Sequence, residues 1–240
     1  MRSFLFVLIV LISGSASGMI YGSLNLLFVE PLLDQAILIE NQQMFASGKE
    51  KDTPEFWTKY DEYRIWQKSG QVFAGVIYGI SLASLFGIIF VFSQNSLPGK
   101  DIKKSIILGL VIWTVIYLIP FLKYPANPPT VGEPETIVLR GILYLSFIAI
   151  SGFSALVFYK IYKKLKTQKF LAVLAYLFFI AIVFFVMPGN PDKITAPLEL
   201  VEHFRIISVL TMTTYWISLG FIFGYLWYRF KPDKEIPRSI

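Results

Sequence analysis

Long uncharged apolar stretches alternate with short polar segments along the chain. A soluble core would instead show apolar stripes at the period of a helix or a strand. Crossing the hydrocarbon core of a bilayer needs roughly 20 residues of helix. Six stretches meet this length: Phe4–Phe28, Gly70–Phe92, Ser105–Leu122, Ile137–Tyr159, Phe170–Met187 and Phe204–Tyr228. The pattern predicts an all-α integral membrane protein, a bundle of about six transmembrane helices in a single transmembrane domain over residues 1–240.

The first stretch begins as a signal peptide does. Arg2 precedes an apolar run, and small residues follow at Gly14–Gly18. The apolar character continues through Ile20 and Leu24–Val29, which is too long for the apolar region of a cleaved signal. We therefore expect this stretch to be retained as the first helix.

Composition supports the bilayer as the solvent of this chain. Hydrophobic residues make up 55% of its 240 residues and charged residues 16%, against about 25% charged residues in an ordinary globular domain. The chain has no cysteine, which excludes disulfides and thiolate metal sites. Phosphate-binding loops, paired-histidine zinc motifs and nucleophile–base pairs are also missing from the sequence. Neither an enzyme nor a cofactor is expected.

Basic residues are concentrated on one side of the predicted bundle. The amino end, the 93–104 and 160–169 loops and the tail after Tyr228 hold thirteen of them against three acids. The other side holds nine bases and thirteen acids. Lys and Arg accumulate in cytoplasmic loops, so both termini are predicted to be cytoplasmic. The net charge of +6 therefore reflects membrane orientation, and no nucleic acid partner is expected.

Residues 30–69 form the longest predicted extracytoplasmic segment. It opens with EPLLDQAILIE, in which Pro31 suits the first turn of a helix. Glu30, Asp34 and Asn41 fall on one face of that helix at spacings of four and seven. We expect a short helix on the membrane or against the bundle, followed by a polar stretch over 46–65. The aromatic residues of this segment are typical membrane-interface anchors: Trp57, Tyr60, Tyr63 and Trp66.

Small residues, most of them glycine, recur at every fourth position in three of the predicted helices. Such stripes let helix backbones approach closely in lipid, where the hydrophobic effect does not drive helices together. Packing is the expected role of these residues, and a lined pore is the alternative that we considered. The stripes comprise Gly14, Gly18 and Gly22, then Gly75, Gly79 and Gly87, and finally Gly220 and Gly224.

The connection between the third and fourth predicted helices reads FLKYPANPPTVGEPETIVLRGILYL. The five prolines from Pro120 to Pro134 exclude a regular helix and predict a rigid loop that caps or re-enters the bundle. This loop presents Asn127, Glu133 and Glu135, and Arg140 follows just inside the next helix. An arginine there either holds a loop or a carboxylate at the bilayer rim, or serves as a charged gate.

The last outer connection carries the single histidine of the chain. Glu199 and His203 are four residues apart and can share a helix face, which makes them a candidate metal pair. A lone histidine is more often a hydrogen-bonded structural residue. Arg205 follows two residues later and has the same two interpretations as Arg140.

Four segments resemble the CbtA family, whose members are described as probable subunits of a cobalt transporter. They are EPLLDQAILIE, KSGQVFAGVIYG, FLKYPANPPTVGEPETI with Arg140, and FRIISVLTMTTYWISLGFIFG, in order from the first predicted helix to the sixth. The resemblance implies a membrane component of cobalt(II) uptake, often accompanied by a small one-helix CbtB-like partner with a His-rich end. The positions that match are Glu30, Asp34, Glu40, Lys123, Asn127, Glu133, Glu135, Arg140 and Arg205.

The chemistry of the chain is compatible with that implication. One histidine and no cysteine provide no tight cobalt site, whereas a permeation path needs binding weak enough to release the ion. An acidic, proline-rich outer vestibule would concentrate a divalent cation. Two alternatives stay open: a permease for another small solute held by Arg140 and Arg205, and a non-transporting scaffold subunit of a membrane complex.

Overall fold

The computed structural model describes residues 2–129 and 131–233. Within these residues the chain is helical and has no strand. Five helical segments are long and apolar enough to cross a bilayer: Ser3–Ala46, Pro54–Ser96, Asp101–Lys123, Pro134–Lys164 and Leu198–Phe230. The sixth predicted helix is present as α7, Phe170–Val186, an apolar helix of 17 residues that is shorter than the other five. The fold class of a multi-pass helical membrane protein is therefore confirmed.

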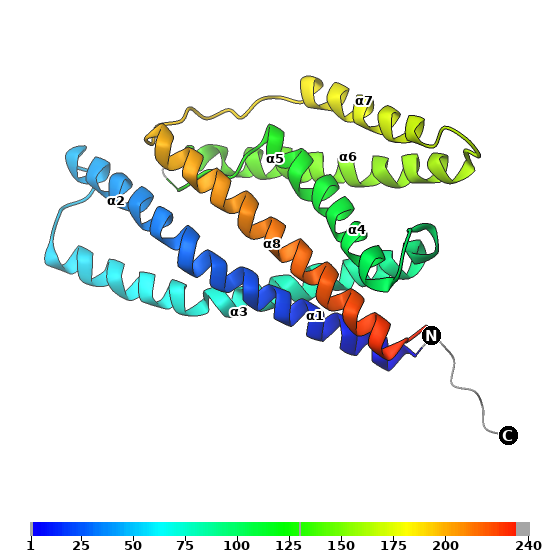
Figure 1. Cartoon of the computed structure of the whole chain (residues 1–240). Helices are drawn as coiled ribbons and strands as arrows, with labels where there is room; N and C mark the ends of the chain where they lie inside the picture. The colour runs from blue at the N-terminus through cyan, green and yellow to red at the C-terminus, as the bar shows by residue number, and fades with distance from the viewer. Residues whose placement is uncertain (1, 130, 234–240) are drawn as a thin grey trace. The chain divides into compact units, whose positions relative to one another are not determined.

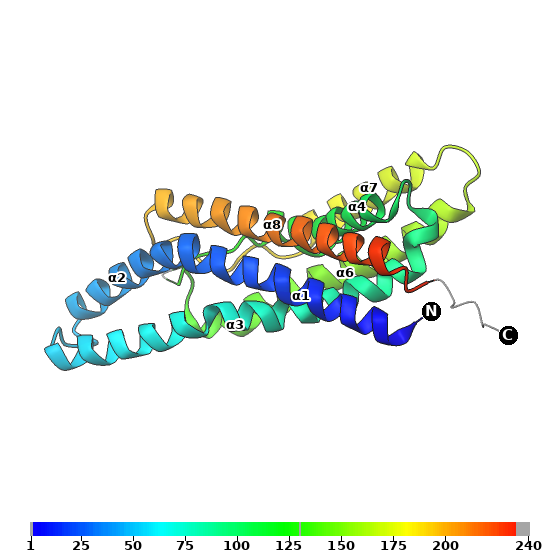
Figure 2. The ribbon, with the colours of Figure 1, turned by 60° about the horizontal axis from the view of Figure 1, so that its bottom comes forward.

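The first long helix is built from three consecutive pieces. Helix α1 covers Ser3–Leu24, a π-helical turn covers Asn25–Val29, and α2 covers Glu30–Ala46. Helix α3, Pro54–Ser93, returns beside it as the second arm of a hairpin (Figures 1 and 2). A short 3₁₀ turn, Gln94–Ser96, follows α3.

Residues 30–69 differ from the loop with a short helix that the sequence suggested. Most of this segment continues the two arms of the hairpin, and only 47–53 between α2 and α3 lie outside them. Helix continues past Val29 through the π-helical turn, and Pro31 lies two residues after that turn, where the backbone hydrogen-bond pattern has already changed. Thr53 caps α3 by accepting a hydrogen bond from the Phe56 N–H at 3.3 Å. Residues 54–65 are polar, so their composition gave no apolar signal for this part of α3.

A second π-helical turn followed by a proline occurs in the third long helix. Helix α4 covers Asp101–Trp113, a second π-helical turn covers Thr114–Leu118, and α5 covers Ile119–Lys123. Pro120 lies in the first turn of α5, and the third predicted helix, Ser105–Leu122, continues through it to Lys123. A 3₁₀ turn at Pro134–Thr136 opens α6, Ile137–Lys164, and the chain closes with α8, Leu198–Phe230.

The chain divides into two compact units. Among the described residues, the first unit contains 2–111 and 206–233, and the second contains 112–205. The expectation of a single transmembrane domain concerns the whole chain in the bilayer and stays a prediction.

Glycine contacts hold the helices of the first unit together. A side chain at Gly14 would lie 2.7 Å from the Ile80 Cα, and one at Gly18 would overlap the Gly75 carbonyl oxygen. On the other arm, a side chain at Gly79 would meet the Gly14 carbonyl oxygen. The α1 and α3 backbones therefore touch along their shared length, as a small-residue stripe permits. Helices α4 and α8 approach in the same way at Gly220 and Gly224, while Gly22, Gly75 and Gly87 extend the first contact.

The core of the second unit lies between α5, α6 and α7. Its buried residues are Ile119, Tyr124, Phe147 and Ile180, and a second buried cluster of the same unit comprises Val131, Ala196 and Val201. Ser151 of α6 donates a hydrogen bond to the Val115 carbonyl in the second π-helical turn at 2.7 Å. A π turn changes the backbone hydrogen-bond pattern, and this carbonyl is satisfied by a side chain from a neighbouring helix.

Candidate functional site

Four charged side chains meet between α2 and α3 in the first unit. Glu30 and Asp34 are one turn apart on α2, and Arg64 and Lys68 are one turn apart on α3. The Arg64 guanidinium donates to the Glu30 and Asp34 carboxylates, the latter at 2.7 Å, and Lys68 donates to Asp34 at 2.7 Å. Gln67 accepts a further hydrogen bond from Arg64. We call these five residues the hairpin network.

The hairpin network is buried at its centre. The side chains of Arg64 and Glu30 are 5% and 4% exposed, whereas those of Asp34 and Lys68 are about one-third exposed. Burying a charge costs much free energy unless the charge is paired and hydrogen-bonded. In this network two carboxylates are paired with two cationic side chains, which offsets that cost. Both carboxylates are engaged by cationic side chains, so a divalent cation could bind them only by displacing Arg64 or Lys68.

The π-helical turn at Asn25–Val29 helps to aim Glu30 at α3. Each α-helical residue turns the chain by about 100°, so 16 residues place Glu30 about 160° away from Gly14 around an ideal helix. A π turn accommodates one additional residue and removes about 100° of that rotation. The glycine face and the Glu30–Asp34 face then both lie toward α3. Asn25 stabilises the turn, because its side-chain amide donates to the Tyr21 carbonyl at 2.8 Å.

A second polar cluster in the second unit ties the α5–α6 connection to the α7–α8 connection. The Arg140 Nε lies 2.9 Å from Asp192 Oδ2, and the Asp192 side chain is only 3% exposed. Thr136 donates to the same carboxylate at 2.8 Å. Gly132 has φ +109°, and a side chain there would lie 2.6 Å from the Asp192 carboxylate, so glycine is needed at this contact. Arg140 is therefore paired with a carboxylate, and its role at the bilayer rim or as a charged gate stays a prediction.

Two more hydrogen bonds fix the same connections. Arg205 donates to the Asn127 side-chain oxygen through Nη2 at 2.7 Å. The Tyr124 hydroxyl donates to the Pro188 carbonyl at 2.6 Å. Burial raises the pKa of the Tyr124 hydroxyl. The proline-rich loop is thus anchored at both of its ends.

The other predicted site residues stay apart from these clusters. Glu133, Glu135, Glu199 and His203 are exposed. Among residues 2–129 and 131–233, no group of three or more His, Cys, Asp or Glu side chains is placed to hold a metal ion. Glu199 and His203 thus gain no third protein ligand within the described chain.

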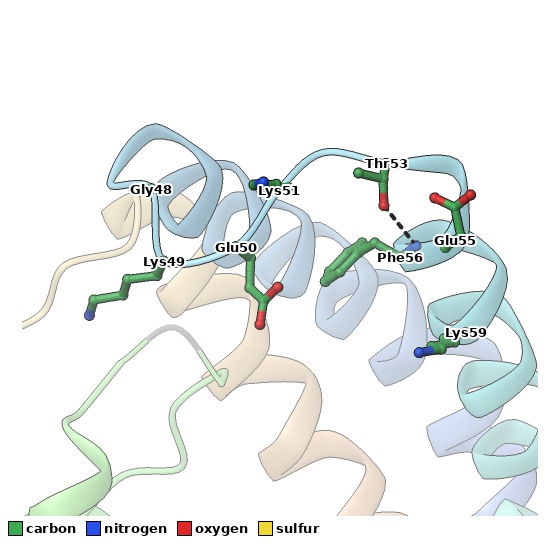
Figure 3. A pocket seen from close by; sticks show the side chains of 8 residues that line it. All are labelled: Gly48, Lys49, Glu50, Lys51, Thr53, Glu55, Phe56 and Lys59. Atoms are coloured by element: carbon green, nitrogen blue, oxygen red, sulfur yellow. Dashed lines mark hydrogen bonds between the residues drawn. The ribbon is translucent and has the colours of Figure 1, made fainter.

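A shallow hollow of about 600 Å³ lies at the tip of the hairpin, between the end of α2 and the start of α3 (Figure 3). Its lining is mixed in charge: Gly48, Lys49, Glu50, Lys51, Thr53, Glu55, Phe56 and Lys59. Lysine is not a preferred metal ligand at neutral pH, because its ammonium group has no free lone pair. The two carboxylates beside the lysines, Glu50 and Glu55, belong to no group of three His, Cys, Asp or Glu side chains in the described part of the chain.

Sequence reasoning missed Arg64, Lys68 and Asp192. A signal for the first two was present, because two acids spaced by four precede two bases spaced by four, which matches an antiparallel pair of helices. The spacing could be used only if the stretch that contains Arg64 was already known to be helical, and the sequence predicted a polar stretch without a helix over 46–65. Asp192 has no such signal, since its pairing with Arg140 depends on how two irregular loops fold.

Comparison with known proteins identifies one family. The family model CbtA, described as probable cobalt transporter subunit, matches residues 4–228. Curated proteins and solved structures yield no match to the chain.

Proposed function

The chain belongs to the CbtA family of probable cobalt transporter subunits, and on this premise we propose that it forms the membrane path for cobalt(II) uptake. The observation that carries the proposal is the hairpin network, a pair of carboxylates held at the point where α1 and α3 leave their apolar stretches. Ionisable groups at such positions commonly mark ion paths.

In this proposal Arg64 acts as a tethered cation. Its guanidinium occupies Glu30 and Asp34 when no ion is present, and an arriving cobalt(II) ion competes for the same oxygens. Cobalt(II) accepts carboxylate and amide oxygen ligands, which Glu30, Asp34 and Gln67 supply. The competition keeps the site weak, and a path must release its ion as readily as it binds it.

The exposed acids of the second unit would serve as the outer vestibule. Glu133, Glu135 and Glu199 are exposed, so their charge is available to raise the local concentration of a divalent cation. A small His-rich membrane subunit of the CbtB type would supply the imidazole ligands that this chain lacks. Arg140 and Arg205 are engaged by Asp192 and Asn127, which weakens the alternative of a permease that holds an anionic solute.

The membrane orientation is part of the same proposal. The Arg2 N–H donates to the Pro232 carbonyl at 2.8 Å, so the two ends of the first unit lie side by side. A chain whose ends share one side of a membrane crosses it an even number of times. Five long helices are an odd number, and we infer that α7 is the sixth crossing. Its 17 residues span about 26 Å, close to the roughly 30 Å hydrocarbon core. Both ends are then cytoplasmic by the distribution of lysine and arginine.

Uptake of radiolabelled cobalt tests the function. Cells that lack their own copy of the protein would express the wild type, Glu30→Gln, Asp34→Asn, or Glu62→Gln as a matched control at an exposed acid of α3. We expect the first two variants to lose at least about tenfold in uptake and Glu62→Gln to retain it, with membrane levels measured for each. A Glu133→Gln/Glu135→Gln double variant should raise the KM and leave the maximal rate unchanged.

Three outcomes would contradict the proposal. Uptake unchanged in both network variants would exclude Glu30 and Asp34 from the path. Uptake unchanged in the deletion strain would exclude cobalt uptake altogether. Stoichiometric co-purification with larger membrane partners, together with no flux in proteoliposomes containing the small subunit, would identify a scaffold.

A further inference from the structure

The connection between α6 and α7 carries an unusual density of positive charge. Residues 160–169 read KIYKKLKTQK, with five lysines and no acid, and all five lysines are exposed: Lys160, Lys163, Lys164, Lys166 and Lys169. None of them takes part in an ion pair with the described part of the chain. Five like charges within ten residues repel one another unless counter-ions lie among them.

Helix dipoles account for only part of this charge. Lys163 and Lys164 lie in the last turn of α6, where the negative end of the helix favours cations. Lys169, in contrast, stands at the N-cap of α7, makes no side-chain cap, and has no acid in the turn that follows. The positive end of α7 therefore lies next to a lysine, and this arrangement favours an anion.

Two aromatic rings hold lysines close to the ends of the helices. The Lys163 Nζ lies 5.7 Å from the centre of the Tyr159 ring, and the Lys169 Nζ lies 5.3 Å from that of Tyr162. Tyrosine rings of this kind settle at the headgroup level of a bilayer. Helix α7 is about 4 Å shorter than a typical hydrocarbon core, so it draws its flanking residues toward the headgroups. The lysines are thus positioned at the depth of lipid phosphates.

We propose that residues 160–169 and the start of α7 form a docking surface for anionic phospholipid headgroups. The positive charge of the lysines complements the negative charge of a phospholipid headgroup. The apolar helices α6 and α7 flank the segment and confine it to the bilayer border, where such headgroups lie. Each basic residue near an anionic surface contributes about fivefold to binding. Lysines that served only for orientation would be solvated and would not distinguish one phospholipid from another.

Thermal unfolding of the full chain in detergent tests the surface. Phosphatidylglycerol and phosphatidylcholine with identical acyl chains would be added to the wild type and to a Lys163→Gln/Lys164→Gln/Lys166→Gln/Lys169→Gln variant. We expect phosphatidylglycerol to raise the wild-type Tm several degrees more than phosphatidylcholine does, and the variant to lose most of that difference. A matched variant at the 93–104 loop, Lys100→Gln/Lys103→Gln/Lys104→Gln, should retain it.

Two further measurements distinguish lipid binding from a loss of folding. The four substitutions made to arginine should preserve the preference for phosphatidylglycerol, and salt should reduce it in the wild type. These two readouts apply even if the glutamine variant fails to fold. Equal stabilisation of the wild type by both lipids would overturn the proposal. It would also fail if inorganic phosphate reproduced the shift at comparable concentration, which would indicate a free-phosphate site, or if only an acidic peptide gave a shift.

Discussion

At the scale of single residues, Arg64 is the side chain on which most of the polar structure of the first unit depends. It contacts both carboxylates of α2 and the Gln67 amide of its own helix, and it is almost fully buried. Removing one member of a buried ion pair leaves the other charged and unpaired, which costs more than the pair itself contributes.

Arg64→Met should therefore destabilise the chain by about 3–5 kcal/mol. Adding Glu30→Gln should recover part of this loss, because the unpaired buried carboxylate is then gone. Thermal unfolding of the four proteins in a double-mutant cycle measures the coupling, with Lys59→Met on exposed α3 surface as the control. Additive effects of the two substitutions would show that Glu30 and Arg64 do not interact.

The sequence identified several residues of these clusters but not their partners. Glu30, Asp34, Asn127, Arg140 and Arg205 all stood out, because charged or amide groups beside apolar helices need a reason to be there. The partners Arg64 and Asp192 lie 34 and 52 residues away from Glu30 and Arg140. Local periodicity carries no information on contacts at that separation unless the intervening turn is known.

At the scale of elements, the glycine stripes and the two π-helical turns determine how the helices meet. Spacing of four residues was sufficient to expect the stripes, since it follows directly from helix geometry. The π turns were not predictable in the same way. Pro31 and Pro120 each lie two residues after a π turn and inside a continuing helix, and no spacing in the sequence indicated those turns.

Gly18→Ala tests the α1–α3 contact at this scale. The added methyl group would overlap the Gly75 backbone, which cannot move aside as a side chain can. We expect a loss of about 1–3 kcal/mol in the free energy of unfolding, as for other overpacked contacts. Gly152→Ala on α6 is the matched control, because a side chain there would have no atom within 4 Å. Equal Tm values for the two variants would contradict a tight backbone contact at Gly18.

At the scale of the whole molecule, the number of crossings connects the fold to its orientation. The helical membrane class followed from composition and from the length of the apolar stretches alone. The sequence did not indicate that the first helix continues to Ala46 or that the second begins at Pro54. A polar stretch of helix has no apolar pattern by which to recognise it.

Cysteine labelling tests the six-crossing topology, and the chain offers a cysteine-free background. Lys166→Cys precedes α7 and Asn190→Cys follows it, and both positions are exposed. A membrane-impermeant maleimide should label Asn190→Cys in intact cells, and should label Lys166→Cys only after the membrane is permeabilised. Labelling of both from outside, or of neither, would show that α7 does not cross.

The π turn at Asn25–Val29 also makes chain length, and not only residue identity, a determinant of the hairpin network. Loss of one codon from this stretch would restore an uninterrupted α-helix while leaving every charged residue encoded. Glu30 and Asp34 would then be rotated by about 100° away from Arg64. A one-residue deletion there is expected to be far more harmful than replacing exposed Leu27. Related sequences that keep the two acids should therefore rarely carry single-residue gaps between Leu24 and Glu30.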